Sequence, residues 1–383
     1  MNNEIGIYIH IPFCISKCFY CDFTSYANRE NMIEKYIYAL CNEILAKAEI
    51  LSEYKVTTIY IGGGTPSYID SKYIKQIFDT LMLVINKEDV KEITIEVNPN
   101  SVDEEKMRNY KEIGINRISI GLQSTYDTIL KKIGRAHNLK DFEDTLELAN
   151  KVGFKNISVD LIYPLPDLDL EKFKESVEYV INLKDKNVKH ISIYNLEVHE
   201  NTKLAFLLKE GYVTLVDEDT EYEMYEYLRK RFEEEGYHRY EISNYAMDGY
   251  ESKHNLRYWN QELYLGFGCG ASSFFSGTRY SNIKNIEKYI ENIETGNSII
   301  DKENYEELDL LALMKEYVML SLRKIEGLDK KKFKAKYKKD IEEIFAEEIK
   351  ELTDDKLIEE KQDKILLTKR GLEVANLVWE KFV

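Results

Sequence analysis

Residues 5–21 read IGIYIHIPFCISKCFYC, a strand-like apolar run that leads directly into three closely spaced cysteines. Short runs of β-branched and apolar residues recur further along the chain, and each is followed by a segment with helical spacing. This alternation is typical of β/α units around a parallel sheet. The cysteines therefore stand where a first strand of such a sheet ends.

The alternation predicts six strands with helices between them. We expect strands at residues 5–11, 57–61, 92–97, 117–120, 156–162 and 190–194, and helices near residues 30–51, 70–85, 103–113, 140–152 and 170–184. Six units predict an α/β fold with an incomplete (β/α)6 barrel of the TIM type. In parallel barrels the chemistry lies at the C-terminal ends of the strands, so a motif directly after a strand is a candidate for function.

A chain of 383 residues exceeds the size at which one core stops growing, so we expect a large domain and a smaller one. The barrel is assigned to residues 1–216 and an extension to residues 217–300. The extension begins with a charged helix over residues 219–235, and the Tyr- and Gly-rich stretch after it is expected to shape one side of the pocket. Residues 301–383, rich in Lys and Glu, are expected to form a small helical, winged-helix-like domain.

Composition excludes several classes of protein. The formal net charge of -16 argues against a general nucleic-acid binder, because affinity for the phosphate backbone needs a basic surface. No stretch approaches the roughly 20 consecutive apolar residues of a membrane helix, so an integral membrane protein is not expected. Residues Met1 to Glu4 carry an acid in place of a basic patch, so we expect no signal peptide and a cytoplasmic location.

Cys14, Cys18 and Cys21 crowd into eight residues of a chain with five cysteines, which favours metal ligation over a disulfide framework. A cubane iron–sulfur cluster held by only three thiolates keeps one iron open for an outside chelator. Structural zinc would need a fourth Cys or His, and His10 lies back in the strand. The triad therefore favours a 4Fe-4S cluster. Cys41 stands apart and suits apolar packing.

The Cys-x3-Cys-x2-Cys spacing resembles the radical S-adenosylmethionine (SAM) superfamily, in which the open iron binds the amino and carboxylate groups of SAM. Residues 7–14 and 17–23 resemble the oxygen-independent coproporphyrinogen III oxidase group. The oxidases carry a further cysteine two residues after the third, where this sequence has Phe23; Cys-Asp-Phe is typical of the HemW haem-chaperone branch. Tyr8 and Tyr20 match aromatic positions that flank the cluster and the adenine, with plain packing as the alternative.

Residues 62–66, GGGTP, follow the second predicted strand and resemble the methionine-binding segment of the superfamily. Glycine lets backbone carbonyls approach an ammonium group closely, although a tight turn would also use such residues. On this resemblance Gly63, Gly64 and Thr65 contact SAM. Glu96, at the end of the third strand, offers a carboxylate to the ammonium or hydroxyls of a ligand.

Three polar side chains further along, Gln123, Arg135 and Asp160, match SAM contacts of the family. Gln123 offers a donor and an acceptor, and Arg135 offers a planar fork for a carboxylate. An unpaired acid within an apolar strand is costly, so Asp160 should meet polar groups, and the family places ribose hydroxyls there. Pro164 stands where the family usually has glycine, which leaves the geometry of that turn open.

Residues 240–246 and 254–259, YEISNYA and HNLRYW, resemble a block of the HemW branch. On this resemblance His254 is a candidate axial ligand of haem iron, with a packed, hydrogen-bonded histidine as the alternative. Ser272 occupies a position where the family commonly has histidine. Cys269 could substitute as a thiolate ligand, although packing in a glycine-rich loop would also suit it.

The resemblance implies a haem chaperone that delivers haem to respiratory haemoproteins, supported by the cluster and SAM. It also implies an electron donor such as flavodoxin or ferredoxin, and peripheral contact with the membrane during delivery. A second hypothesis is an oxygen-independent coproporphyrinogen III oxidase, in which a radical from SAM starts oxidative decarboxylation. A third is a radical SAM methyltransferase or a haem-degrading relative, because one barrel supports many chemistries. Whether the protein is an enzyme stays open.

Overall fold

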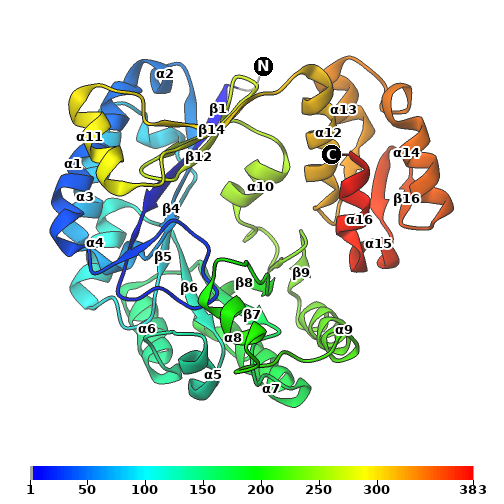
Figure 1. Cartoon of the computed structure of the whole chain (residues 1–383), viewed down its shortest axis with the longest axis horizontal. Coiled ribbons are helices and arrows are strands. Elements are labelled where there is room, and N and C mark those ends of the chain that lie inside the picture. The colour runs from blue at the N-terminus through cyan, green and yellow to red at the C-terminus, as the bar shows by residue number, and fades with distance from the viewer. Residues whose placement is uncertain (1–2, 383) are drawn as a thin grey trace.

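Six parallel strands form the centre of the computed structural model, which describes residues 3–382 (Figure 1). They are β1 (Glu4–Ile11), β4 (Lys55–Gly63), β5 (Glu92–Val97), β6 (Arg117–Gln123), β7 (Ile157–Tyr163) and β8 (Val188–Asn195). They lie side by side in chain order. All six predicted strands are confirmed. Met1 and Asn2, part of the segment used to judge a signal peptide, lie outside the described residues.

Helices follow the strands and cover the outer face of the curved sheet (Figure 1). They are α1 (Ile33–Ala46), α3 (Ser71–Leu81), α4 (Glu104–Ile113), α6 (Leu139–Val152) and α7 (Leu170–Ile181). Four of them begin after an Asp or Asn whose side chain accepts a hydrogen bond from the first turn, namely Asp70, Asp103, Asn138 and Asp169. These caps satisfy backbone N–H groups that a helix leaves free, so the local sequence sets where each helix starts.

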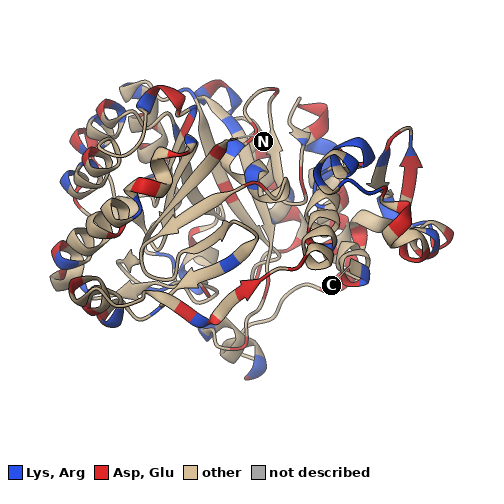
Figure 2. Cartoon of the chain, turned by 90° about the horizontal axis from the view of Figure 1, so that it is seen from above, with Lys and Arg blue, Asp and Glu red and all other residues tan. Residues whose placement is uncertain are grey.

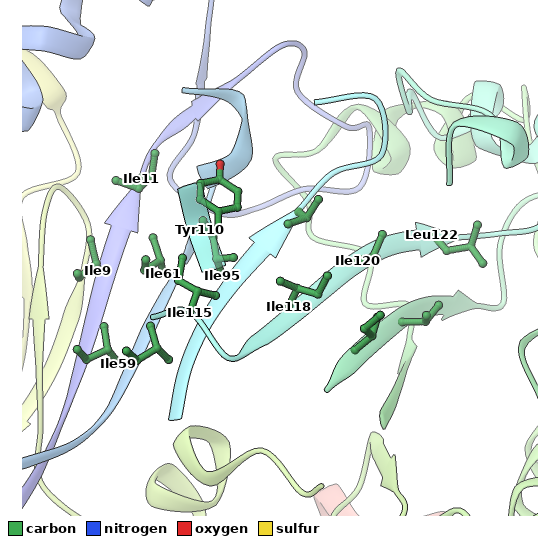
Figure 3. Packing of buried hydrophobic residues seen from close by; sticks show 14 of the residues in the cluster. Ile9, Ile11, Ile59, Ile61, Ile95, Tyr110, Ile115, Ile118, Ile120 and Leu122 are labelled. Atoms are coloured by element: carbon green, nitrogen blue, oxygen red, sulfur yellow. The ribbon is translucent and has the colours of Figure 1, made fainter. Parts of the chain in front are cut away.

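The two faces of the sheet differ in chemistry. On the outer face Ile9, Ile59, Ile95 and Ile118 are buried, with Tyr110 of α4 among them (Figure 3). The inner face is polar: register partners Tyr8, Tyr60, Thr94 and Arg117 form one row, and Glu96, Ser119, Ser158 and His190 form the next. Side chains alternate between faces along a strand, so one face builds the core while the other lines the concave side.

Further strands extend this sheet at both ends, so that it holds twelve of the strands among the described residues. Beyond β1 lie β11 (Tyr264–Phe267), β12 (Ser272–Phe275), β13 (Thr278–Asn282) and β14 (Ile300–Glu307); beyond β8 lie β10 (Asn244–Ala246) and β9 (His238–Arg239). No pairing joins the two ends within residues 3–382, which agrees with the predicted incomplete barrel. The predicted charged helix is α9 (Glu218–Glu234).

The chain after β14 builds a second, separate core. Its elements are α12 (Leu310–Leu322), β15 (Leu328–Asp329), α13 (Lys330–Tyr337), α14 (Glu342–Asp354), β16 (Ile358–Lys361), β17 (Lys364–Leu367), α15 (Lys369–Glu373) and α16 (Ala375–Trp379). The first six follow the order of a winged helix, as expected. Because β14 still pairs with β13 of the large sheet, that sheet extends past the expected boundary at residue 300.

Figure 2 colours the ribbon by residue type, and Lys and Arg alternate with Asp and Glu along the outer helices and the C-terminal unit. The acidic excess is therefore not confined to one element of that face. No helix within residues 3–382 combines the length and apolar character that a bilayer span requires.

Ile120→Ala should lower the free energy of unfolding by about 2–5 kcal/mol, because it leaves a cavity in the outer-face core. Ile120 is fully buried, whereas Leu83 is 77% exposed. Leu83→Ala is the matched control and should change stability by no more than about 0.5 kcal/mol. Chemical denaturation followed by circular dichroism measures both variants, and equal losses would contradict the assigned faces.

Candidate functional site

The three cysteines of the triad lie in a loop whose base is closed by a small strand pair. β2 (Phe13–Cys14) pairs with β3 (Tyr26–Ala27) directly after β1. Cys14 is buried, Cys18 and Cys21 are partly exposed, and all three are free thiols. The pair thus holds three sulfur donors at the C-terminal edge of the sheet, where parallel barrels carry their function.

Burial and the neighbouring thiols make Cys14 and Cys21 hard to ionise. Burial raises the pKa of Cys14 to about 11, with the Thr65 hydroxyl opposing the shift and the two other thiols adding to it. Burial also raises the pKa of Cys21. A bound metal supplies the positive charge that deprotonates coordinating thiols. The donor set therefore fits a metal cluster.

The same loop does not suit a single zinc ion. Within residues 3–382 no three His, Cys, Asp or Glu side chains converge closely enough to bind one metal ion. The thiolates of a cubane each bind a different iron, so they need not converge on one point. His10 uses both ring nitrogens, Nδ1 with the Tyr8 hydroxyl at 3.0 Å and Nε2 with the Thr24 carbonyl at 2.7 Å. The zinc alternative therefore lacks its ligands.

Two side chains from other turns reach the cysteine sulfurs. Thr65 Oγ1 donates to Cys14 Sγ at 3.4 Å, and Arg135 Nη1 donates to Cys18 Sγ at 3.6 Å. A cavity beside the loop is lined in part by Cys18, Thr65, Asn98 and Arg135. Two residues predicted to contact SAM, Thr65 and Arg135, therefore reach sulfurs of the triad and share one cavity with Cys18.

The turn after β4 requires glycine because it is pressed against β1 and the cysteine loop. Gly63 has φ of +113°, and a Cβ there would lie 2.4 Å from the His10 ring. A Cβ at Gly64 would lie 2.9 Å from the Ile11 carbonyl oxygen. The Gly63 N–H donates to Glu96 Oε2 at 3.1 Å. The glycines thus allow close approach to a candidate ligand-binding carboxylate.

Two carboxylates and one cation lie on the inner face near this edge. Glu96 accepts a hydrogen bond from the Tyr60 hydroxyl at 2.9 Å, and burial raises its pKa to about 7. Ser119 Oγ lies 3.1 Å from both oxygens of Asp160, whose pKa burial also raises. Arg117 is 2% exposed, and its positive charge partly opposes the rise of the pKa of both carboxyl groups. Carboxylates perturbed in this way are typical of functional sites.

Gln123 is held in an unusual conformation and is incompletely bonded. Its φ is +66°, it lies at a register shift in β6, and its buried Oε1 has no partner within residues 3–382. Such strain and an unused acceptor are features of ligand sites.

The two tyrosines predicted to flank the cluster and the adenine are neutral. Burial raises the pKa of Tyr8 and Tyr20 well above 10, and Tyr20 lies near Cys18 and Arg135.

Known proteins share both parts of this architecture. Residues 8–180 match the model of the Radical SAM superfamily, and residues 308–374 match the HemN C-terminal domain. The chain is 38% identical over 332 residues to Heme chaperone HemW of Bacillus subtilis, covering 86% of each chain. It is 36% identical over 376 residues to Heme chaperone HemW of Lactococcus lactis, covering 98% of this chain and 96% of that one.

The chain belongs to the HemW family of radical SAM proteins. Its fold also matches that of coproporphyrinogen III oxidase (HemN) from Escherichia coli, with a TM-score of 0.86 over 99% of this chain and 90% of that one. That protein is 21% identical, so the match speaks for the fold alone.

In this HemW-family chain, His254 is built into the concave side of the sheet. It lies in α10 (Lys253–Trp259), is fully buried, and its Nδ1 bonds with Thr58 Oγ1 at 2.9 Å. Its Nε2 bonds with the Tyr258 hydroxyl at 2.8 Å, and burial lowers its pKa to about 3. Both nitrogens are therefore used, as in the packed, hydrogen-bonded alternative. The haem-ligand role stays a prediction that this geometry does not support.

The structure also describes the two departures from the family pattern, Ser272 and Pro164, and the two cysteines outside the triad, Cys41 and Cys269. Ser272 begins β12 and is exposed. Cys269 is buried and its Sγ donates to Lys284 O at 2.7 Å, and Cys41 is buried in α1. Pro164 follows a cis peptide bond directly after β7. Both outlying cysteines are therefore packed side chains, and neither presents a free thiolate.

Sequence reasoning gave no role to Asn98 or Tyr60, although both contact predicted site residues. Tyr60 donates to Glu96, and Asn98 bonds with Thr65 and Arg135. The two-residue period of a strand could have predicted the position of Asn98. It lies two residues after Glu96, so both side chains are expected on the inner face of the sheet.

Acid should destabilise the metal-free protein through its buried histidines. Burial holds the pKa of His190 and His254 below 6.5, so below pH 6.5 the unfolded chain binds protons that the folded chain does not. Each histidine should then lower the free energy of unfolding by about 1.4 kcal/mol per pH unit. Urea denaturation between pH 6.5 and 5 measures this slope. His254→Gln should remove one histidine's share, and an unchanged slope would contradict the buried, neutral state.

Proposed function

We propose that this protein is a haem chaperone that carries a 4Fe-4S cluster on Cys14, Cys18 and Cys21, binds SAM at the open iron and delivers haem to respiratory haemoproteins. The observation that carries the proposal is the three-thiol loop at the sheet edge, in a chain that resembles Heme chaperone HemW proteins over 86–98% of its length. Phe23, 70% exposed after the third cysteine, supports the chaperone over the oxidase. Delivery from the cytoplasm with peripheral membrane contact, and a flavodoxin or ferredoxin as electron donor, belong to the same proposal.

Different residues around the loop would bind different groups of SAM. Arg135 would pair with the methionyl carboxylate, since its guanidinium already lies 3.6 Å from Cys18 Sγ. Glu96 and the glycine turn would accept hydrogen bonds from the N–H groups of the iron-bound amine, and Asp160 and Gln123 would bind the ribose hydroxyls. When bound and reduced, the cluster supplies one-electron chemistry toward SAM. The protein contributes orientation and a largely buried set of charges.

Anaerobically reconstituted protein should retain haem, seen as a Soret band after gel filtration, and should form no decarboxylated product from coproporphyrinogen III. This outcome follows if the family resemblance extends to function. Formation of product, measured by chromatography, would support the oxidase and overturn the chaperone.

A matched pair of cysteine variants controls that experiment. Cys18→Ser removes one predicted ligand and should abolish the brown cluster chromophore, whereas Cys41→Ser, in the helical core, should assemble it as wild type does. Cluster assembly in Cys18→Ser equal to wild type would remove the triad from the proposal.

SAM should bind about ten-fold more tightly at pH 8 than at pH 6. Burial raises the pKa of Glu96 to about 7, and its ionised form accepts hydrogen bonds from the N–H groups of the iron-bound SAM amine more strongly, so affinity rises as the pH passes this value. Equilibrium dialysis measures the dissociation constant. Glu96→Gln should bind weakly and lose this component, while titration of the ligand's own amino group affects both proteins equally. A wild-type pH profile in Glu96→Gln would exclude this role.

A further inference from the structure

A chain of hydrogen bonds joins two of the three cysteines through three other side chains. Thr65 Oγ1 donates to Cys14 Sγ at 3.4 Å, and Asn98 Nδ2 donates to Thr65 Oγ1 at 2.8 Å. Arg135 Nη2 donates to Asn98 Oδ1 at 2.6 Å, and Arg135 Nη1 donates to Cys18 Sγ at 3.6 Å. Asn98 is the centre of this chain, although it touches neither sulfur itself.

The chemistry of the amide fixes the direction of every bond in the chain. Asn98 has one donor end and one acceptor end, and a flipped amide would set its N–H groups against the Arg135 guanidinium, donor against donor. With the N–H end on Thr65, the hydroxyl oxygen accepts and its own proton is free to point at Cys14. With the oxygen end on Arg135, one Nη is held and the other faces Cys18. Asn98 thus helps to aim two donors at two sulfurs. The guanidinium is held as well by the Gly121 carbonyl, 2.9 Å from Nη2, and by His137 Nδ1, 3.4 Å from Nε.

Hydrogen bonds within its own turn fix the backbone of Asn98. Its backbone N–H donates to Ser67 Oγ at 3.0 Å, and Ser101 Oγ donates to its carbonyl at 2.5 Å. Lys106 Nζ donates to the carbonyls of both Ser67 and Ser101, at 2.8 and 3.0 Å. The amide is therefore presented by a bonded turn after β5, and its placement does not depend on the cysteine loop alone.

We propose that Asn98 is a positioning residue that directs the Thr65 hydroxyl to Cys14 and the Arg135 guanidinium to Cys18, and thereby raises the reduction potential of the cluster these cysteines hold. The inference rests on the proposed function, in which the loop carries an iron–sulfur cluster. Hydrogen bonds to the sulfurs of such a cluster tune its potential. Reduction adds negative charge to the cluster, so donors aimed at its ligands stabilise the reduced form more than the oxidised one.

Asn98→Asp tests the proposal with almost no change of shape. A carboxylate only accepts hydrogen bonds. The Thr65 hydroxyl should therefore turn its proton from Cys14 to the introduced carboxylate, and Arg135 should pair with this carboxylate more tightly than with Cys18. The midpoint potential should fall, as measured by anaerobic redox titration followed by electron paramagnetic resonance. SAM is left out, because its carboxylate would compete for Arg135. Iron and sulfide content per chain verify that the cluster is assembled.

Asn100→Asp is the matched control for charge. Asn100 is exposed in the same turn, lines the same cavity and makes no bond to Thr65 or Arg135. Its substitution should lower the potential less than Asn98→Asp does. Thr65→Val, which removes the Thr65 donor to Cys14, should also lower the potential, and the double variant with Asn98→Asp should shift it by less than the sum of the two.

The outcomes separate this inference from the proposed function. If wild type assembles no cluster, the proposed function fails, and the inference fails with it. If wild type assembles the cluster and Asn98→Asp leaves the potential unchanged, or lowers it no more than Asn100→Asp, the role of Asn98 is overturned while the proposed function stands. Should Asn98→Asp assemble poorly, Asn98→Ser removes the bridge without adding charge, and an unchanged potential in that variant is equally decisive against the proposal.

Discussion

Along six parallel strands every second side chain must leave the apolar core, and in this chain those side chains are tyrosine, glutamate, arginine, serine and histidine. The outer face can be so uniformly aliphatic because polar groups are collected on the inner one. The same two-residue period sets the spacing of the site, since Glu96 and Asn98 follow one another on the inner face of β5 and its turn. The alternation of side chains along each strand therefore sets both the apolar packing of the outer face and the polar chemistry of the inner face.

The two histidines buried on the concave side are held by hydrogen bonds at both ring nitrogens. His190 bonds with Ser158 and Tyr240, each at 2.8 Å, and His254 is held by Thr58 and Tyr258. Toward the cysteine loop, Gln123 Oε1 is left without a partner in the described chain, and Thr94 Oγ1 and Arg117 Nε are left so at the other end of the inner face. The burial that neutralises the deep histidines is thus the same effect that leaves the edge carboxylates responsive to a ligand.

The cysteine loop gains its chemical character from elements that lie far away in the sequence. Thr65 and Arg135 bring donors from the turns after β4 and α5 (Asp127–Lys132), and Gly63 lets the first of these turns approach His10. A loop with three thiols could bind several metals. The use of both His10 nitrogens removes this histidine as a zinc ligand, and the match to the Radical SAM superfamily implies a 4Fe-4S cluster.

The sequence by itself determined the six strands, the helices capped by Asp and Asn, the triad and the candidate SAM residues, because each of these depends on local period or on motif spacing. Only the tertiary structure decided how His254 is bonded, since Thr58 lies 196 positions away, and that Asn98 links Thr65 to Arg135. It also revealed the short strands between residues 237 and 282, which have too few residues to carry a readable period. Hydrogen bonds between distant segments depend on how the sheet curves, and no local pattern encodes that curvature.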